Sequence, residues 1–479
     1  MKSALVAFFA LFTVANVHAQ TKEAEVYVID EKQVAIAENL MQAGLESKLA
    51  YQIVESLTTE IGPRLGGSEA EQRAREWGVK LGKALSFDRV SVEEFTMPYW
   101  ERGEMEISLS SPYKQELYGT ALGGSGQTSA PLDAPVVYFR SLKELQSIDV
   151  GELKGKIAFV DGDAMVKSQT GGGYGAANQR RRVGWQHAER GEALALVVRS
   201  VGSDFHRFPH TGMMSAKTAE NEGEEESQWA SIPVIAISNP DADHLRRLHK
   251  LGEKLSMTLH STAGWKEDAI SGNVVLDIVG REKPDEIVLI GGHLDSWDLG
   301  TGAVDDGAGV AITTAAAELI ARLPKRPRRT IRVVMFGAEE VGLLGARAYA
   351  KEHESELSKH VLATESDFGA DTIWQFVSNV NKAANPVIDA ISQVITPLGI
   401  VRGPSDVNNG GPDIIPLAMQ GVPTIRLNQN GMDYFDLHHT PDDTLDKIDP
   451  DKLAQNVAAY AAVIYLAAEL DVEFRRQAP

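Results

Sequence analysis

The stretch EIVLIGGHLDSWDLGTGAVDDGAG, residues 286–309, decides the fold and points to the chemistry of the chain. It opens with an apolar run typical of a buried strand and continues into a glycine-rich segment with one histidine and four aspartates. The residues that follow, VAITTAAAELIARL, have the apolar pattern of a helix. Because glycine tolerates tight turns, this segment can bring polar ligands from a strand end and a helix start to one place.

The chain beyond this unit keeps alternating between strands and helices. TIRVVMFGA, KHVLATESD and VPTIRL are predicted strands, and GLLGARAYAKEH and NPVIDAISQVI are predicted helices. Such alternation indicates an α/β sheet domain, in which ligands collect at the carboxyl ends of the strands. From about Ser110 the texture changes to short β-rich runs, APVVYF, GKIAFV, ALALVV and IPVIAI. These predict a β-rich module inserted into the α/β domain.

The length of 479 residues exceeds that of one ordinary compact domain. We therefore predict a signal peptide at 1–19, the first part of the α/β domain at 20–110, the inserted module at 111–265 and the rest of the α/β domain at 266–479. The first residues, MKSALVAFFALFTVANVHAQ, contain a lysine, a short apolar run and a small-residue cleavage pattern. This pattern predicts a secreted or periplasmic protein, and no later run reaches the length of a membrane span.

Charge and cysteine content restrict the partners. The chain carries 67 acidic and 47 basic residues, a formal charge of -20, which argues against a nucleic-acid or anionic-membrane partner. It has no cysteine, so disulfides and thiolate ligands are excluded. A metal ion must therefore be held by His, Asp and Glu.

Five such residues follow apolar runs or stand in polar loops, and we expect them to converge at one edge of the sheet: His293, Asp305, Glu340, Asp367 and His439. Two histidines and three carboxylates suit a pair of divalent ions that share one carboxylate, and zinc matches this set of nitrogen and oxygen ligands. Two ions about 3.5 to 4 Å apart can activate a water and polarise a carbonyl. Taken singly, each residue is more often solvated or structural, and the joint pattern carries the prediction.

Glu339 and Asp295 stand beside these ligands. If the segment is extended, Glu339 and Glu340 point to opposite sides, so that Glu340 binds metal and Glu339 faces the substrate as a general base. Asp295 is placed to hydrogen-bond the far nitrogen of His293. By contrast, His206 and His210 are predicted to be structural. Arg180 to Arg182 are predicted to be surface charge, with the alternative that one of them reaches a substrate carboxylate.

The segments GGHLDSWDLGTGAVDDGAG, RVVMFGAEEVGLLGARAY, ESD and HHTPDDT resemble those of the M28 family of co-catalytic zinc peptidases. The resemblance extends over nearly the whole chain after residue 19. It implies a mixed sheet flanked by helices, an inserted protease-associated (PA) domain, two Zn²⁺ per chain and a homodimer.

The resemblance also assigns roles. Asp305 would bridge both ions, His293 and Asp367 would complete one site, and Glu340 and His439 the other. His439 is chosen over His438 because the family's histidine directly precedes Thr or Ser. A cis peptide bond is implied between Asp305 and the next residue. The family's oxyanion-binding tyrosine is not found at a matching place, so His438 is the alternative donor.

Together these features predict an exported di-zinc exopeptidase that hydrolyses short peptides, above all dipeptides, with a free amino terminus. A zinc-bound water would attack the peptide bond with Glu339 as general base. Two alternatives stay open: a single-zinc enzyme of the glutaminyl cyclase type, and a non-catalytic binding protein on the same scaffold. The sequence does not identify the residues that bind the substrate.

Overall fold

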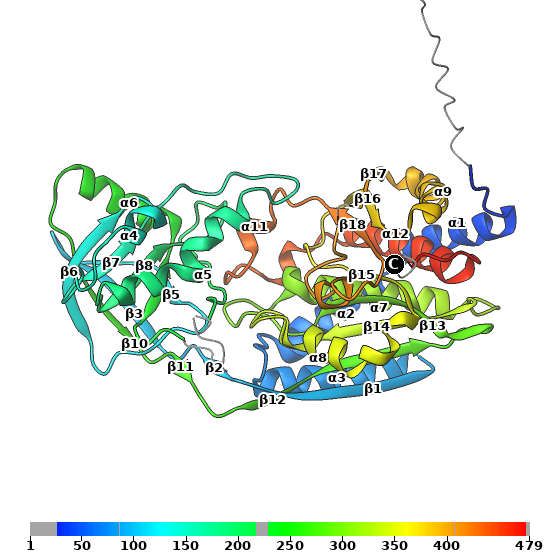
Figure 1. Cartoon of the computed structure of the whole chain (residues 1–479), viewed down its shortest axis with the longest axis horizontal. Helices are drawn as coiled ribbons and strands as arrows, with labels where there is room; N and C mark the ends of the chain where they lie inside the picture. The colour runs from blue at the N-terminus through cyan, green and yellow to red at the C-terminus, as the bar shows by residue number, and fades with distance from the viewer. Residues whose placement is uncertain (1–25, 86, 217–228, 407, 476–479) are drawn as a thin grey trace, which may run out of the picture.

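The structure, a computed structural model, describes residues 26–85, 87–216, 229–406 and 408–475. Two lobes lie side by side, each built around a β-sheet (Figure 1). The predicted signal peptide, residues 1–19, lies outside the described residues. Within the described ranges, no helix combines the length and the apolar character needed to cross a membrane.

The larger lobe contains a mixed sheet of eight described strands. Their order across the sheet is β1 (Arg89–Met97), β12 (Ala269–Ile278), β14 (Arg329–Phe336), β13 (Lys283–His293), β15 (His360–Glu365), β18 (Thr424–Gln429), β16 (Ile373–Asn379) and β17 (Val401–Ser405). Strands β14, β13, β15 and β18 run parallel, and β1 and β12 pair antiparallel with their neighbours. Strand β16 pairs antiparallel with β18 and parallel with β17. The predicted α/β class and mixed sheet are thus confirmed.

Helices cover both faces of this sheet because its strands alternate between two apolar faces. On β14, Ile331, Val333 and Met335 belong to one core, and Val334 and Phe336 to the other. The first core is covered by α1 (Glu31–Glu46), α2 (Leu49–Ser56), α3 (Glu69–Ala84), α7 (Ala308–Ala321), α9 (Asn385–Ile395) and α12 (Pro450–Glu469). The second core is covered by α8 (Leu344–Glu352) and α10 (Ile415–Ala418).

The helix that packs most deeply, α12, starts at a well-defined cap. Asp449 accepts hydrogen bonds from the amides of Asp451 and Lys452, and Pro450 occupies the first turn. Many of its residues are alanines, which allow close approach. A Cβ added to Gly44 of α1 would lie 2.5 Å from the Cα of Ala458, so α1 and α12 touch at the backbone. This contact fixes the layer of helices behind the ligand-bearing strands.

The smaller lobe contains a second sheet of eight described strands, flanked by three helices. Its order is β4 (Gln115–Glu116), β3 (Met105–Ser111), β10 (Ser256–Ser261), β6 (Leu132–Phe139), β7 (Ile157–Val160), β8 (Ala195–Arg199), β9 (Val234–Ile237) and β5 (Gly119–Ala121). The helices are α4 (Leu142–Gln146), α5 (Tyr174–Arg190) and α6 (Asn239–Lys250). The sheet begins at Met105, before the boundary predicted at residue 111, and the domain boundaries themselves stay predictions.

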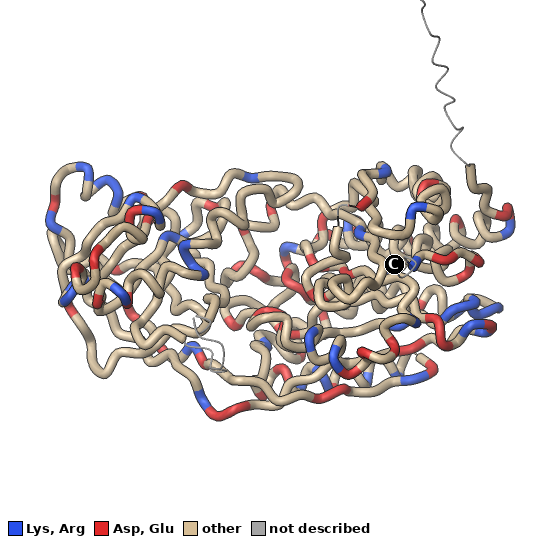
Figure 2. The backbone as a smooth tube through the Cα atoms, in the orientation of Figure 1, with Lys and Arg blue, Asp and Glu red and all other residues tan. Residues whose placement is uncertain are grey.

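Shorter elements connect these parts. They are the ribbon β2 (Trp100–Glu101) with β11 (Gly264–Trp265), α11 (Tyr434–Leu437), a π-helical turn at Leu57–Ile61, and 3-10 turns at Glu354–Lys359, Lys382–Ala384, Thr396–Leu398 and Leu445–Lys447. The segment Ala303–Gly307 is a kinked turn in which Asp305 and Asp306 have non-helical backbone angles. In Figure 2, Asp and Glu segments gather in the centre of the view, where the two lobes meet. The carboxyl ends of β13, β14 and β15 lead into this region.

Candidate metal centre and active site

Three of the five predicted ligands follow parallel strands at the same sheet edge. His293 is the last residue of β13, Glu340 follows β14, and Asp367 follows β15. In the register of the sheet, His293 stands opposite Phe336, the last residue of β14. The convergence is therefore a consequence of strand order, as expected for an α/β sheet.

His293 points its Nε2 atom at two carboxylates. Its Nε2 lies 3.1 Å from Asp305 Oδ1 and 3.8 Å from Asp367 Oδ1. The other ring nitrogen, Nδ1, lies 3.0 Å from the backbone carbonyl of Asp295. This contact favours the tautomer with the proton on Nδ1, which leaves the lone pair of Nε2 free for a metal ion.

Asp305 lies between this group and a second one. His439 Nε2 is 3.4 Å from Asp305 Oδ2 and 2.9 Å from Glu340 Oε2. His438 also reaches Asp305 Oδ2, at 3.6 Å, and its ring stacks on that of His439 with a centroid distance of 3.4 Å. The five predicted residues thus form one cluster with Asp305 in the middle, and His439 contacts more of its carboxylates than His438 does.

The cluster has the composition of a site for divalent cations. Asp305 Oδ2 and Glu340 Oε1 are buried and have no hydrogen-bond partner among the described residues. Among the described residues, three groups could each hold a metal ion, because the donor atoms of each group lie within 4.8 Å of one another: Asp305 with His438 and His439, His293 with Asp305 and Glu340, and His293 with Asp306 and Asp367. Buried carboxylates without partners are costly unless a cation neutralises them, so the donor set fits metal ions.

Burial and mutual repulsion shift the carboxyl groups apart in pKa. Burial, reinforced by the charge of Asp305, raises the pKa of Glu340 well above its ordinary value. Burial and the charge of Glu340 do the same to the pKa of Glu339. Although burial opposes it, hydrogen bonds from His293 and His439 hold the pKa of Asp305 well below its ordinary value. These pKa shifts describe the cluster without a cation. The positive charge of a bound cation would lower the pKa values of the carboxyl groups.

The loop that carries Asp305 is fixed by two residues that sequence reasoning missed. The fully buried guanidinium of Arg64 donates to the backbone carbonyls of Leu294, Thr301 and Gly302. The carboxylate of Asp443 accepts from the amides of Val304, at 2.6 Å, and Asp305, at 3.3 Å.

Only Asp443 has a signal in the sequence, since it belongs to the motif HHTPDDT. The peptide bond between Asp305 and Asp306 is cis, as the family resemblance implied.

Asp295 and Glu339 are adjacent, but in a different arrangement from the one expected. The carboxylate of Asp295 accepts from the amides of Glu339, at 2.9 Å, and Glu340, at 3.3 Å. Its Oδ1 is 3.7 Å from His293 Nδ1, and the backbone carbonyl makes the shorter contact. Residues 337–340 form a bend with Ala338 at φ 56, not the extended segment assumed. Asp295 therefore supports the glutamate pair directly and His293 through its main chain.

The smaller lobe contributes to the second group of ligands. The carbonyl of Thr211 lies 3.2 Å from His439 Nδ1, and the amide of Thr211 donates to the carbonyl of His439 at 3.0 Å. His210 bridges from Asp204 Oδ1, at 2.6 Å, to the carbonyl of His438, at 2.7 Å. His210 thus makes structural contacts, as predicted. One of these contacts is with the main chain of His438, beside the metal cluster. His206 has a ring contact with Phe208.

A cleft of about 820 Å³ opens over the cluster and is lined by both lobes. The run Arg180 to Arg182 on α5 is not uniformly surface charge: Arg180 and Arg181 are buried, because they donate to backbone carbonyls of the same lobe. Arg181 lines the cleft and donates to the hydroxyl of Tyr174 at 2.7 Å.

Two tyrosines also line this cleft. The ring centroids of Tyr434 and Tyr174 lie 5.1 Å and 5.3 Å from that of His438. Tyr434 stands shortly before the tandem histidines, although the sequence showed no tyrosine at a place matching that of the family, and Tyr174 comes from the other lobe. The site therefore holds phenol groups that the motifs alone did not predict.

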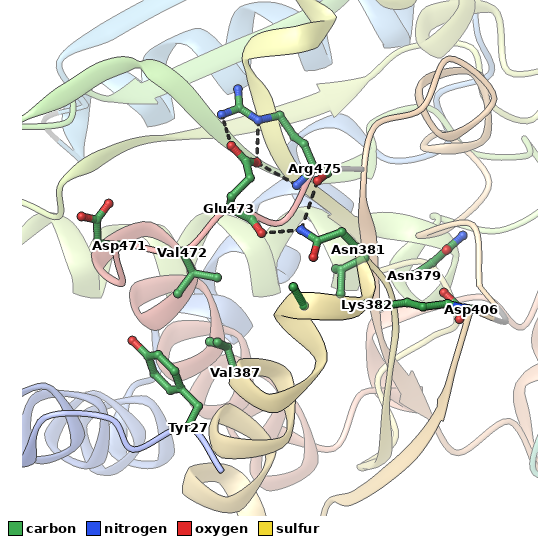
Figure 3. A pocket seen from close by; sticks show the side chains of 12 residues that line it. Tyr27, Asn379, Asn381, Lys382, Val387, Asp406, Asp471, Val472, Glu473 and Arg475 are labelled. Carbon is green, nitrogen blue, oxygen red and sulfur yellow. Dashed lines mark hydrogen bonds and ion pairs between the residues drawn. The ribbon is translucent and has the colours of Figure 1, made fainter. Parts of the chain in front are cut away.

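A larger cavity, about 1070 Å³, lies near the chain ends and is a different kind of place (Figure 3). Its polar side chains bond to one another: Asn381 donates to the carbonyls of Glu473 and Arg475, and Arg475 pairs with the carboxylate of Glu473. None of the three candidate metal-ligand groups lies there. Its size therefore does not make it the centre of the chemistry.

A mixed α/β sheet whose strand ends gather buried histidines and carboxylates defines a metal-dependent hydrolase. The model of peptidase family M28 matches residues 273–464. Carboxypeptidase Q of Mus musculus is 32% identical over 436 residues, which are 90% of this chain and 88% of that protein. The chain belongs to peptidase family M28 and is a metallopeptidase.

Solved structures agree with this assignment. The crystal structure of a peptidase M28 precursor from Shewanella amazonensis is similar at a TM-score of 0.89 and 47% identity, covering 94% of this chain and 100% of that one. The zinc aminopeptidase BSAP from Bacillus subtilis has a TM-score of 0.62 at 23% identity, covering 88% and 95% of the two chains. The second likeness concerns the fold alone.

Proposed function

We propose that the chain is an exported, co-catalytic di-zinc exopeptidase that hydrolyses dipeptides and short peptides with a free amino terminus. One observation carries the proposal: the two oxygens of Asp305 face different histidines, with Oδ1 3.1 Å from His293 Nε2 and Oδ2 3.4 Å from His439 Nε2. A carboxylate in this position suits a ligand shared by two ions. The alternative of a single zinc would leave one of these histidines without a metal.

The contacts of the cluster support the assignment of ligands that the family resemblance implies. His293 and Asp367 would hold one ion with Asp305, and Glu340 and His439 the other. When bound, the ions supply a water with a lowered pKa and polarise the carbonyl of the peptide bond. BSAP, which has a similar fold, is a zinc aminopeptidase, and this supports zinc as the metal.

Glu339 is the residue we assign to proton transfer. It lines the cleft beside Glu340, and its main chain is fixed by the carboxylate of Asp295. Glu339 takes a proton from the attacking water and gives it to the leaving amine. Because the same carboxylate acts first as base and then as acid, the reaction needs no second base in the cleft. The ring of His438 faces the cleft beside Asp305, and we assign it to hydrogen-bond the oxygen on which charge develops.

The substrate class rests on the relatives and on the cleft. Carboxypeptidase Q and the aminopeptidases are named for opposite ends of a peptide, and in a dipeptide both activities cut the same bond. A cleft lined on one side by the smaller lobe suits a short substrate. We further propose that the smaller lobe is an inserted PA domain, that residues 1–19 are cleaved on export and that the chain forms a homodimer.

The test uses the mature protein and a panel of free dipeptides with their N-acetylated forms. Cleavage of the free forms alone, lost on chelation and restored by zinc, is the expected result. Metal analysis should give two zinc ions per chain, whereas one ion with cyclisation of amino-terminal glutamine would establish the alternative enzyme. In Glu339→Gln, turnover should fall by about 10²- to 10⁴-fold at unchanged zinc content. Equal cleavage by the variant would overturn the role of Glu339.

A further inference from the structure

A smaller pocket of about 340 Å³ adjoins the metal cleft and shares four lining residues with it. The shared residues are Tyr174, Phe368, Arg426 and Phe435. Three of them form an aromatic wall, in which Tyr174 stacks on Phe435 with a centroid distance of 4.6 Å and Phe368 meets Phe435 edge to face at 5.9 Å. The fourth, Arg426, is the only charged residue among the described residues that line this pocket.

Arg426 reaches the pocket from strand β18 because of the alternation along that strand. Ile425 and Leu427 are fully buried in the core behind the sheet, so Arg426 and Asn428 point to the opposite face. Asn428 donates to Gln375 Oε1 at 3.0 Å and is thereby satisfied. Among the described residues, Arg426 has one hydrogen-bond contact, in which its Nη2 lies 3.5 Å from the backbone carbonyl of Asp367, a predicted metal ligand.

Among the described residues, the guanidinium of Arg426 has neither an ion-paired carboxylate nor a full set of carbonyl acceptors, whereas the fully buried Arg64 donates to four backbone carbonyls. Arg199 pairs with Asp161 at 2.7 Å, and Arg332 pairs with Asp277 at 2.7 Å. Within the described ranges, no carboxylate forms an ion pair with Arg426. A second donor stands nearby, because Nε1 of Trp374, which also lines the pocket, is buried and has no partner among the described residues. A half-buried cation and an unused N–H donor together form a site for an anion.

We propose that Arg426, assisted by Trp374, binds a carboxylate on the substrate residue that follows the cleaved bond. The inference rests on the proposed peptidase function and deepens it. One residue of extended chain spans about 3.3 to 3.6 Å, so a carboxylate one residue beyond the reacting carbonyl needs a donor directly beside the metal ligands. Arg426 satisfies this condition through its contact with Asp367. The carboxylate is either the chain terminus of a dipeptide or an acidic side chain at that position.

The other arginines of the cleft are less suitable for this role. Arg181 is buried, with Nη1 donating to the carbonyl of Thr211 and Nη2 to the hydroxyl of Tyr174, so only its Nε lacks a partner among the described residues. Arg182 donates to Ser215 Oγ and Arg347 to the carbonyl of Gly342, and both are exposed. Within the described residues, neither Arg182 nor Arg347 has a hydrogen bond to a predicted metal ligand. Arg347 therefore offers a matched control on the same cleft.

The experiment compares the zinc-loaded wild type with Arg426→Ala, Arg426→Lys and Arg347→Ala on three substrates. Ala-Ala offers a terminal carboxylate, Ala-Ala-amide offers none, and Ala-Glu-amide offers only a side-chain carboxylate. Arg426→Ala should raise KM about 10- to 100-fold for the substrate whose carboxylate it binds, with kcat and zinc content little changed. Arg426→Lys should recover part of the loss, because lysine keeps the charge but not the fork of donors.

The three substrates distinguish which carboxylate Arg426 binds. A KM effect on Ala-Ala alone assigns the terminal carboxylate, and an effect on Ala-Glu-amide alone assigns the side chain. Arg347→Ala should match the wild type on all three substrates. An equal loss on Ala-Ala-amide, or loss of zinc from Arg426→Ala, would make Arg426 a structural residue and overturn the proposal. If the wild type cleaves none of the three, the proposed function fails and not the subsite alone.

Discussion

The two groups of ligands on either side of Asp305 are held in different ways. In one group, His293 and Asp367 follow neighbouring parallel strands, and His293 Nδ1 contacts the carbonyl of Asp295 two residues further along. In the other group, His439 lies in a loop at φ 62, and its Nδ1 contacts the carbonyl of Thr211, 228 residues away in the smaller lobe.

The difference has a consequence for assembly. The group of His293 and Asp367, called here the strand-held group, depends on the register of one sheet and on a contact within one loop. The group that contains His439, called here the loop-held group, depends on packing between the two lobes. Both the side chain and the main chain of His439 contact Thr211 of the smaller lobe. The lobes are therefore coupled through the metal centre, and changes in the smaller lobe should reach only one side of it.

The largest effect should come from Asp305→Ala, which removes the carboxylate common to both groups. We expect zinc content near zero and a fall in activity on the order of 10³-fold or more, because the ions supply several kcal/mol of transition-state stabilisation. Metal analysis and dipeptide turnover measure this, and circular dichroism checks that the sheet has formed. A variant that keeps two ions would show that Asp305 is not shared.

A second change, Asp295→Ala, separates the two roles given to this residue. It removes the carboxylate from the amides of Glu339 and Glu340 but keeps the backbone carbonyl that contacts His293. Turnover should fall about 10- to 100-fold, as for other partners that orient catalytic groups, with the zinc at His293 retained. Selective loss of that zinc would instead show that the Asp295 carboxylate orients His293, as the sequence had suggested.

A third change, His210→Ala, acts on the loop-held group alone. It removes the bridge from Asp204 to the carbonyl of His438 while Thr211 stays in contact with His439. We therefore expect a loss of about tenfold in affinity for one of two zinc ions, with a matching loss of activity at limiting zinc. His206→Ala, in the same loop, is the control and should resemble the wild type. A loss of both ions in His210→Ala would contradict the separation of the two groups.

The sequence predicted the ligands that follow strands well, in both groups, because each of them is next to an apolar run in the chain. The runs before His293, Glu340 and Asp367 became β13, β14 and β15, and their parallel order brings the three together. Sequence reasoning also found the tandem histidines through a motif. It could not find Thr211 or Arg64, since their contacts join residues more than 200 positions apart and leave no local pattern.

Some elements were missed for a different reason. Helix α12 is buried along nearly its whole length, so its apolar residues surround the helix and show no amphipathic stripe. Strand β1 lies at the edge of the sheet and is mostly half-exposed, so polar residues dominate it. The arginines of α5 were predicted to be on the surface because a run of three charges is typical of solvent. Burial of Arg180 and Arg181 depends on carbonyls that only the fold supplies.

The smallest effect on activity should come from His360, at the start of β15 and at the opposite end of that strand from Asp367. Burial lowers the pKa of His360 to about 4, from the ordinary 6.5. The folded state thus keeps the imidazole neutral while the unfolded chain takes up a proton below pH 6.5. Stability must therefore fall as the pH decreases from 6.5 towards 4, by about 2 kcal/mol between pH 7 and pH 5.

The measurement is the free energy of unfolding of the zinc-loaded protein against pH, for the wild type and for His360→Gln. Glutamine can still bond to the hydroxyl of Tyr349, which lies 2.9 Å from His360 Nε2, but does not titrate. Between pH 7 and pH 5, the free energy of unfolding should fall by about 2 kcal/mol more in the wild type than in His360→Gln. Loss of zinc at low pH affects both proteins alike and therefore cancels in this difference. Dipeptide turnover at pH 7 should be equal in both. A difference in turnover at pH 7 would mean that a change at the far end of β15 affects the ligands His293 and Asp367. The strand-held group would then depend on more than the sheet register and the loop contact described above.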